Sequence, residues 1–234
     1  MALPSGLTSY ELKRSLVLSN DLEKYYHLRI DKDEKRLPVL TLDGQPAYTP
    51  IDFKQFFGKD GPIEIEIGCG KGGFMVDYAE KHPELPLLGI EKEAEIAFFA
   101  ATRIAKRPHL PHARLLLGDA FFFLRDFLPK GCAQAVHMYF PDPWPKKRQR
   151  KHRLANAAFL ELIRRVALPK AKFYWGTDHA EYHADSVELF SSLPWLKVLD
   201  ANAEPTEGIQ TNFEKKYRLA GKPIYRMVFE IETD

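Results

Sequence analysis

The sequence predicts an α/β protein built on a doubly wound, mostly parallel sheet. Short apolar segments bounded by Gly and Pro alternate with longer amphipathic segments, which is the rhythm of strands and helices in such folds. A glycine-rich turn follows the first of these apolar segments and opens the next amphipathic one. The last apolar segment partly alternates between apolar and polar residues, as an antiparallel edge strand does. Together these observations predict seven strands with an antiparallel strand at the C-terminus.

Periodicity and length place the elements in order along the chain. The short apolar segments predict strands at Ile63–Ile67, Leu87–Ile90, Arg114–Leu117, Ala133–Phe140, Lys172–Gly176, Leu196–Leu199 and Tyr225–Glu232. The amphipathic segments predict helices at Gly73–Lys81, Glu93–Arg107, Ala120–Phe127, Asn156–Ala167 and Ala180–Ser192. Between the last two strands, residues 202–223 are polar and are expected to form a functional loop with a short helix.

Composition indicates one main domain, residues 51–234, preceded by an extension, residues 1–50. The chain has 234 residues, of which 45% are hydrophobic and 28% charged, so it can bury one sizeable core. The extension is charged, carries prolines at 38, 46 and 50, and is expected to contain some helix. No chemistry is assigned to it.

The two cysteines, Cys69 and Cys132, are too few for a disulfide framework or a zinc cluster, so no metal site is expected. His179 and His183 have no partners at a metal-ligand spacing and are interpreted as surface or loop residues. No run of about 18 apolar residues occurs in the sequence. We therefore expect a soluble, cytoplasmic protein with no membrane partner.

The first predicted strand ends in the glycine-rich turn Gly68-Cys69-Gly70-Lys71-Gly72-Gly73. Such a turn lets the backbone approach a ligand closely and points free N–H groups at it. The glycine spacing fits a dinucleotide, and with Glu66 two positions earlier it also fits S-adenosyl-L-methionine. A pyrophosphate needs positive charge, whereas S-adenosyl-L-methionine carries a sulfonium and an ammonium, so Glu66 favours the methyl donor. A tight turn without a ligand is the third interpretation.

Two further acids follow the next two predicted strands. Glu91 lies 21 positions after Gly70, the separation at which an acid binds ribose hydroxyls in nucleotide-binding folds. Asp119 could accept a hydrogen bond from an adenine amino group, or it could only cap the helix that follows. Because ligands of open α/β sheets bind at the carboxyl ends of the strands, Glu66, Glu91 and Asp119 predict one cleft.

The fourth predicted strand runs into the turn Phe140-Pro141-Asp142-Pro143-Trp144-Pro145-Lys146. Three prolines fix their φ angles, so Asp142 and Trp144 have little conformational freedom left to lose. Trp144 could stack on a nucleobase or serve as a core or lid residue. Asp142 could hydrogen-bond a base edge and offset positive charge.

A basic cluster follows this turn directly. Six of the eight residues from Lys146 to Arg153 are Lys or Arg, and no acid occurs between Asp142 and Glu161. The formal net charge of the chain is only +2, so attraction to a nucleic acid must come from such a local patch. A solvated helix face is the alternative interpretation.

These motifs together resemble the tRNA (guanine-N7-)-methyltransferase family, called TrmB in bacteria. The resemblance rests on residues 66–72, 89–91, 118–120 and 140–146, on Thr177-Asp178 with Tyr182, and on Thr211-Asn212-Phe213-Glu214. It runs in order over residues 62–231, and the 140–146 string is its most specific part. The resemblance implies a Rossmann-like class I methyltransferase fold for residues 51–234. It also implies an enzyme that methylates N7 of a guanosine in the tRNA variable loop. The partner would be tRNA, and the protein would be a monomer or a homodimer. The N-terminal region carries only scattered basic residues, in contrast to many family members.

The resemblance also implies roles for individual residues. The methyl donor would be bound by Glu66, Gly68, Gly70, Glu91, Asp119 and Asp142, with Asp142 also in the catalytic region. The substrate would be bound by Lys146, Asp178, Thr211, Asn212, Phe213 and Glu214. The basic cluster would add tRNA phosphate contacts from Lys147, Arg148, Arg150, Lys151 and Arg153. From the residues alone, Asp178 could instead cap the helix predicted at 180–192.

N7 of guanine has a lone pair and no proton, so methyl transfer to it needs no general base. The work of the site is positioning, and carboxylates can stabilise the positive charge that develops on the base. Asp142-Pro143-Trp144 also resembles the turn of methyltransferases that act on exocyclic amines of nucleobases, although the aromatic residue is displaced by one position. A nicotinamide-dependent oxidoreductase and a noncatalytic RNA-binding module are the alternatives from other classes.

Overall fold

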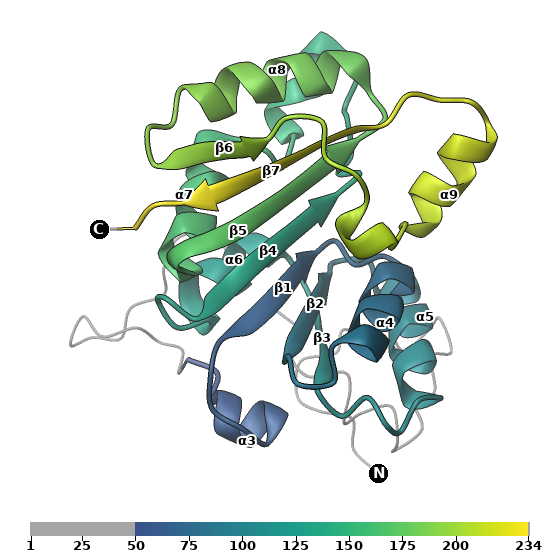
Figure 1. The fold of residues 1–234 in the computed structure, drawn as a ribbon, viewed down its shortest axis with the longest axis vertical. Helices are drawn as coiled ribbons and strands as arrows, with labels where there is room; N and C mark the ends of the chain where they lie inside the picture. The colour runs from purple at the N-terminus through teal and green to yellow at the C-terminus, as the bar shows by residue number, and fades with distance from the viewer. Residues whose placement is uncertain (1–49, 234) are drawn as a thin grey trace. The chain divides into compact units, whose positions relative to one another are not determined.

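A computed structural model describes residues 50–233 of the chain, so the predicted N-terminal extension lies almost entirely outside the described residues. The described residues form the seven strands of a mixed sheet, and this confirms the predicted fold class (Figure 1). They divide into two compact units, each considered by itself. The first unit contains residues 50–61 and 69–129, and the second contains residues 62–68 and 130–233.

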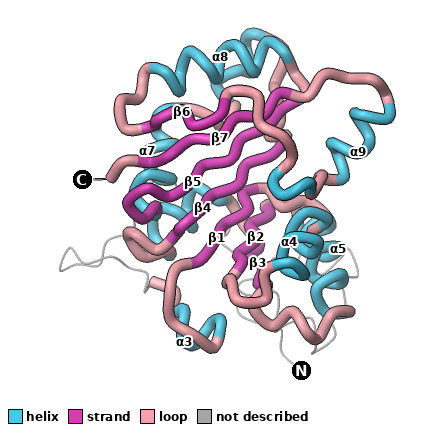
Figure 2. The backbone as a smooth tube through the Cα atoms, viewed as in Figure 1, coloured by secondary structure: helices cyan, strands magenta, loops and turns pink. Residues whose placement is uncertain are grey.

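The first unit consists of two parallel strands and the helices that precede and follow them. Its helices and strands are α3 (Phe53–Phe57), α4 (Gly73–Lys81), β2 (Leu87–Glu91), α5 (Ala94–Ala105), β3 (Ala113–Leu117) and α6 (Ala120–Phe122), which continues into a π-helical turn (Phe123–Phe127). Helices α4 and α5 pack against each other and against both strands, and they are neighbours in Figure 2. Every residue of β2 is buried, because helices cover a parallel sheet of this kind.

The second unit holds the remaining strands in the order β1-β4-β5-β7-β6. Its elements are β1 (Ile63–Ile67), β4 (Ala133–Tyr139), a 3-10 helix (Lys147–His152), α7 (Ala157–Val166), β5 (Ala167–Thr177), α8 (Ala180–Ser191), β6 (Leu196–Asp200), a 3-10 turn (Thr206–Gly208), α9 (Asn212–Leu219) and β7 (Tyr225–Ile231). Strands β1, β4 and β5 are parallel, and β7 runs antiparallel to both β5 and β6 (Figure 1). The predicted antiparallel C-terminal strand is thus confirmed.

Most predicted boundaries agree with the structure to within two residues. Two differ for a physical reason. Strand β5 begins at Ala167, five residues before the prediction; its first part contains Pro169 and Lys170, whose φ is 64°, and its pairing with β4 is irregular between Ala167 and Lys172. The helix predicted at Ala120–Phe127 is one α-helical turn that widens, because the Leu128 N–H donates to the carbonyl of Phe123 five residues back.

Candidate active site

In the first unit, the glycine-rich turn and Glu91 form one hydrogen-bonded group. The backbone N–H of Gly70 donates to Glu91 Oε2 at 3.0 Å, and the N–H of Glu93 donates to Oε1 at 2.9 Å. Gly70 and Gly72 have φ angles of 57° and 69°, and a Cβ at Gly72 would lie 3.0 Å from that of Ala100. The positive φ favours glycine at both positions, and Gly72 also lacks room for a Cβ. The carboxylate of Glu91 is held at the end of β2 with one backbone donor on each oxygen, so each oxygen can accept a further hydroxyl.

Asp119 lies at the same edge of this unit. Leu117 pairs with Glu91 across β2 and β3, and the N–H of Gly118 donates to the Glu91 carbonyl at 2.9 Å. Asp119 follows directly and caps α6 by accepting the N–H of Phe121 through Oδ1 at 2.9 Å. The helix-cap interpretation of Asp119 is therefore confirmed. It does not exclude a ligand role, because the half-buried carboxylate has a second oxygen.

In the second unit, Glu66 lies near the end of β1, is 4% exposed, and pairs in register with His137 of β4. Gly68 follows β1 with a φ of 70°. Two residues before Glu66, the buried Glu64 contacts His137 Nε2 at 3.0 Å. These are acids on a strand that is buried along its whole length. Such acids require polar partners, because an isolated buried carboxylate is strongly unfavourable.

A buried chain of polar side chains continues from His137 and was not predicted from the sequence. His137 Nδ1 lies 3.0 Å from the Tyr139 hydroxyl, which lies 2.7 Å from Thr206 Oγ1. Tyr139 is buried, and burial raises the pKa of its hydroxyl far above the usual value. In the sequence, Glu64 and His137 are conspicuous as polar residues within apolar strands. No pattern near either residue indicates that the two are in contact.

The Phe140–Lys146 turn leaves the end of β4 in a strained conformation. Phe140 and Trp144 have φ angles of 51° and 41°, which are unfavourable for residues with a Cβ. The Phe140 N–H donates to the carbonyl of Gly176 on β5 at 2.7 Å, which anchors the start of the turn. Asp142 is exposed, and the half-buried Trp144 packs against His152 with ring centroids 5.3 Å apart. Trp144 is therefore not a core residue.

Asp178 follows β5 and accepts a hydrogen bond from Lys222 Nζ at 3.1 Å. Its side chain is 17% exposed. The interpretation of Asp178 as a helix cap is wrong, because His179 is the N-cap of α8 and accepts the Tyr182 N–H through Nδ1 at 3.2 Å. The parallel pairing of β4 and β5 brings the residues that follow these strands, including Asp142 and Asp178, to one edge of the unit.

The two histidines interpreted as surface or loop residues have structural roles. His179 caps α8, as described, and His183 lies within that helix. The His183 ring stacks on Tyr225 with centroids 4.5 Å apart and on Trp175 at 5.9 Å. Burial lowers the pKa of His183.

The basic cluster divides into exposed and buried members. Arg150 forms ion pairs with Glu181 and Asp185 of α8, with the Asp185 contact at 3.3 Å. Arg153 has a side chain that is only 6% exposed, pairs with Asp185, and donates to the Pro143 carbonyl at 2.7 Å. Arg153 thus holds the turn against α8. The prediction that Arg153 contacts a tRNA phosphate assumed that it faces solvent, and it does not. The exposed members are Lys146, Lys147, Arg148 and Lys151.

The Thr211–Glu214 segment forms the start of α9. Thr211 is the N-cap and accepts the Glu214 N–H at 3.1 Å. Asn212 and Phe213 are exposed, whereas Glu214 is 0% exposed. Of the four predicted substrate-binding residues in this segment, Asn212 and Phe213 therefore face solvent, and Thr211 and Glu214 are buried.

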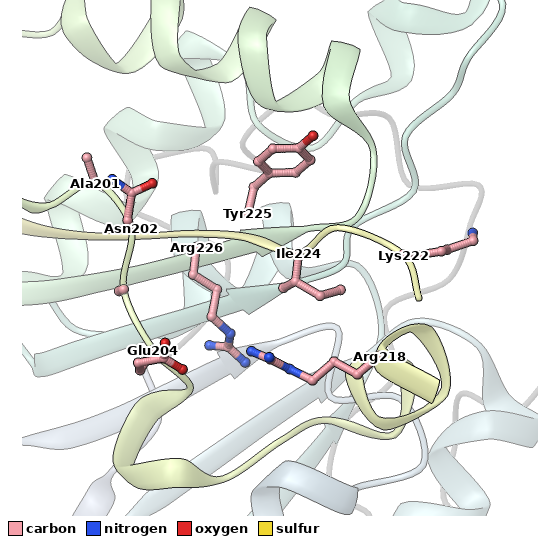
Figure 3. A pocket seen from close by; sticks show the side chains of 9 residues that line it. Ala201, Asn202, Glu204, Arg218, Lys222, Ile224, Tyr225 and Arg226 are labelled. Atoms are coloured by element: carbon pink, nitrogen blue, oxygen red, sulfur yellow. The ribbon is translucent and has the colours of Figure 1, made fainter. Parts of the chain in front are cut away.

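Glu214 is held by two arginines. Arg226 on β7 forms a buried ion pair with it and donates from Nε to Oε1 at 3.3 Å, and Arg218 Nε donates to the same oxygen at 3.0 Å. Figure 3 shows the two guanidinium groups turned toward each other across a pocket of about 210 Å³, whose lining includes Glu204. The Arg226 guanidinium also lies over the Tyr139 ring, 4.6 Å from its centroid.

The described residues hold no group of three or more His, Cys, Asp or Glu side chains that could bind a metal ion. None of the helices within residues 50–233 is both long enough and apolar enough to cross a bilayer. What each unit offers instead is a set of carboxylates at the carboxyl ends of parallel strands, where α/β proteins bind nucleotides and related ligands.

Comparisons of the sequence with known proteins all identify methyltransferases. Residues 60–227 match the model of a family described as a putative methyltransferase. A tRNA (guanine-N(7)-)-methyltransferase of Listeria monocytogenes is 39% identical over 187 residues, which cover 76% of this chain and 86% of that protein. The corresponding protein of Exiguobacterium sibiricum is 34% identical, with 78% and 86% covered.

Solved structures show the same fold at low sequence identity. The antibiotic-resistance methyltransferase Kmr is 16% identical with a TM-score of 0.55, covering 80% of this chain and 95% of that one. A 16S rRNA (adenine(1408)-N(1))-methyltransferase from Catenulisporales acidiphilia, solved with its cosubstrate SAM, is 18% identical with a TM-score of 0.52, covering 79% and 93%.

Proposed function

This chain belongs to the tRNA (guanine-N(7)-)-methyltransferase family, and from that premise we propose that it transfers a methyl group from S-adenosyl-L-methionine to N7 of a guanosine in the variable loop of tRNA. The observation that carries the proposal is the 39% identity to a protein of that name over 86% of its length. The carboxylates at the strand ends of both units support it. A cytoplasmic location and a monomeric or homodimeric state are parts of the same proposal.

The methyl donor supplies an electrophilic methyl group on a sulfonium. Glu91 and Asp119 are suited to its ribose and adenine, since the Glu91 oxygens can each accept a hydroxyl and Asp119 keeps one oxygen beyond its capping bond. The glycine conformations at Gly68 and Gly70 let the backbone approach closely. The negative charge of Glu66 suits the cationic end of the donor.

The residues at the end of β4 and β5 would hold the base. N7 carries no proton, so neither Asp142 nor Asp178 has to act as a base. Their carboxylates can accept from the N1–H and amino edge of guanine and stabilise the charge that develops on the ring. In this mechanism most of the rate enhancement comes from alignment of N7 with the methyl group. The strained turn, anchored by the Phe140 N–H, supplies the required rigidity for Asp142.

The exposed members of the basic cluster would bind tRNA phosphates. Lys146, Lys147, Arg148 and Lys151 are suited to this role by their exposure, whereas Arg150 and Arg153 already pair with acids of α8. Removal of one phosphate contact should weaken the binding of all tRNA sequences by a similar factor. It should also reduce the number of counterions released on binding by about one. We therefore expect Lys146→Ala to raise the KM for tRNA more than the Kd for the methyl donor.

The experiment that tests the function uses purified protein, unmodified tRNA and S-adenosyl-L-methionine with a labelled methyl group. We expect label in the tRNA, and strand cleavage at the modified guanosine after treatment with borohydride and aniline. Labelled tRNA that resists cleavage would indicate methylation of another atom, such as an exocyclic amine. Asp142→Asn should abolish transfer while the fold is kept, because the Asp142 side chain is exposed.

A further inference from the structure

Lys222 lies in a short turn between the end of α9 and the start of β7. The Gly221 N–H donates to the carbonyl of Arg218, and the Lys222 N–H donates to that of Tyr217, both at 3.0 Å. These two bonds form the Schellman arrangement that ends many helices, and the positive φ of Gly221, 65°, is typical of it. Pro223 follows and favours an extended backbone at Lys222. The backbone of Lys222 is therefore restricted from both sides.

The sheet brings this turn to the end of β5. Thr177, the last residue of β5, pairs in antiparallel register with Tyr225, the first residue of β7. Asp178 follows Thr177, and Lys222 precedes Tyr225 by three residues. The Lys222 ammonium donates to Asp178 Oδ2 at 3.1 Å. The register of β5 and β7 thus brings together two residues that are 44 positions apart in the sequence.

The Tyr217 ring contacts the lysine head group from a second side. Lys222 Nζ lies 4.4 Å from the centroid of this half-buried ring, which is within the range of a cation–π contact. Burial raises the pKa of the Tyr217 hydroxyl, the charge of Asp178 adds to the rise, and the charge of Lys222 opposes it. The three side chains therefore interact as one group.

This group contributes little to the stability of the fold. The side chain of Lys222 is 51% exposed and that of Asp178 is 17% exposed. An ion pair that is open to solvent adds little to the free energy of unfolding, and holding a lysine side chain in one conformation costs entropy. The main effect of the contact is therefore on the orientation of the less exposed partner, Asp178.

We propose that Lys222 is a positioning residue for methyl transfer, whose ammonium fixes the orientation of the Asp178 carboxylate toward the guanine base. The inference rests on the proposed function, in which Asp178 accepts from the guanine edge, and it adds a residue that none of the sequence motifs includes. Each carboxylate oxygen has two lone pairs, so Asp178 can accept from the base while Lys222 stays bonded. Because transfer requires alignment of N7 with the methyl group, a displacement of about 1 Å can lower the rate about 100-fold.

The test compares kcat and the KM for unmodified tRNA in the wild-type protein, Lys222→Gln and Lys222→Arg, at saturating S-adenosyl-L-methionine. Glutamine removes the charge, and we expect kcat to fall by about 10-fold to 100-fold with an unchanged Kd for the methyl donor. Arginine also pairs with carboxylates, so Lys222→Arg should retain most of the activity. Lys216→Gln is the matched control, because it removes the same charge from an exposed lysine of α9, and its kcat should equal that of the wild type.

A double-mutant cycle with Asp178→Asn separates positioning from a direct contact with tRNA. Rates are measured in single turnovers with excess enzyme, so that slow variants are included. If Lys222 acts through Asp178, Lys222→Gln should lower the rate in the wild-type background and leave it unchanged in the Asp178→Asn background. An equal effect of Lys222→Gln in both backgrounds would overturn the proposal.

The salt dependence of the tRNA Kd is a second measurement, and it needs no methyl transfer, so it also decides if Asp178→Asn is inactive. A positioning role leaves the number of counterions released on tRNA binding the same in the wild type and Lys222→Gln. A decrease of about one counterion in Lys222→Gln would show that Lys222 binds a tRNA phosphate, and it would overturn the proposal.

The two proposals fail in different ways. A wild-type protein that transfers no methyl group to any tRNA refutes the proposed function. A wild-type protein that methylates tRNA, together with a Lys222→Gln variant of equal kcat, refutes only the role of Lys222.

Discussion

The ion pair between Glu214 and Arg226 predicts a large and specific loss of stability. Glu214→Gln keeps the shape of the side chain but removes the charge opposite Arg226, whose side chain is 3% exposed. Removal of one partner from a buried ion pair costs about 3–5 kcal/mol, because the other charge stays buried. Glutamine can still accept one hydrogen bond, so we expect the lower end, about 3 kcal/mol. For a chain of this size, the unfolding temperature should fall by about 6–12 °C.

The assay is calorimetric or far-UV circular dichroism unfolding at pH 7, with tRNA kinetics measured below the transition. Because the pair joins α9 to β7, Glu214→Gln should also loosen the segment that carries Phe213 and raise the KM for tRNA. Arg218→Gln is the control, since its side chain is 42% exposed and its pair with Glu214 should contribute less than about 1 kcal/mol. A Glu214→Gln variant that loses less than about 1 kcal/mol would refute the reasoning, because Arg226 would then have found another partner or solvent.

Three further predictions concern the stability of the fold. Gly89→Ala should cost about 1–3 kcal/mol in urea unfolding, because the new Cβ would lie 2.7 Å from Met75 Sδ and 3.0 Å from Cys69 Sγ; an unchanged urea midpoint would show that both sulfurs can move. The Phe140→Gly variant should be more stable than the Phe140→Ala variant by about 0.5–1 kcal/mol. Both substitutions remove the ring, but only glycine adopts the positive φ without strain. A more stable alanine variant would mean that the backbone is not strained. Burial lowers the pKa of His112, so below about pH 6.5 the unfolded chain takes up a proton that the folded chain does not. Stability should therefore fall between pH 7 and pH 5, and His112→Gln should show a smaller fall; equal pH dependence of the two urea midpoints would remove His112 as a contributor.

Much of the fold follows from local patterns in the sequence. Ile63–Ile67 and Gly73–Lys81 have the predicted bounds, because an apolar run that ends in glycine and an amphipathic repeat are local properties. The start of β5 was missed because Pro169 and Lys170 look like a turn when considered alone. Lys170 is itself not extended, and the pairing of β5 with β4 passes irregularly from Ala167 to Lys172, which no local pattern reveals.

The candidate site was predictable to the extent that it depends on strand ends. Glu91 and Asp119 end or follow neighbouring parallel strands, and the topology of such a sheet places these ends along one edge. The Glu64–His137 contact, between residues 73 positions apart, was not predictable in the same way. Nothing near either residue in the sequence identifies its partner.

By itself, the sequence determined which residues stand at the strand ends, and its motifs determined the family. Those features depend on periodicity and on glycine and proline positions, which act over a few residues. Only the tertiary structure decided which charged side chains form ion pairs within the protein. Arg153 pairs with Asp185 of α8, and Glu214 pairs with Arg226 of β7. The physical reason is that burial is a property of packing between distant segments, and a charge that packing removes from water must be paired.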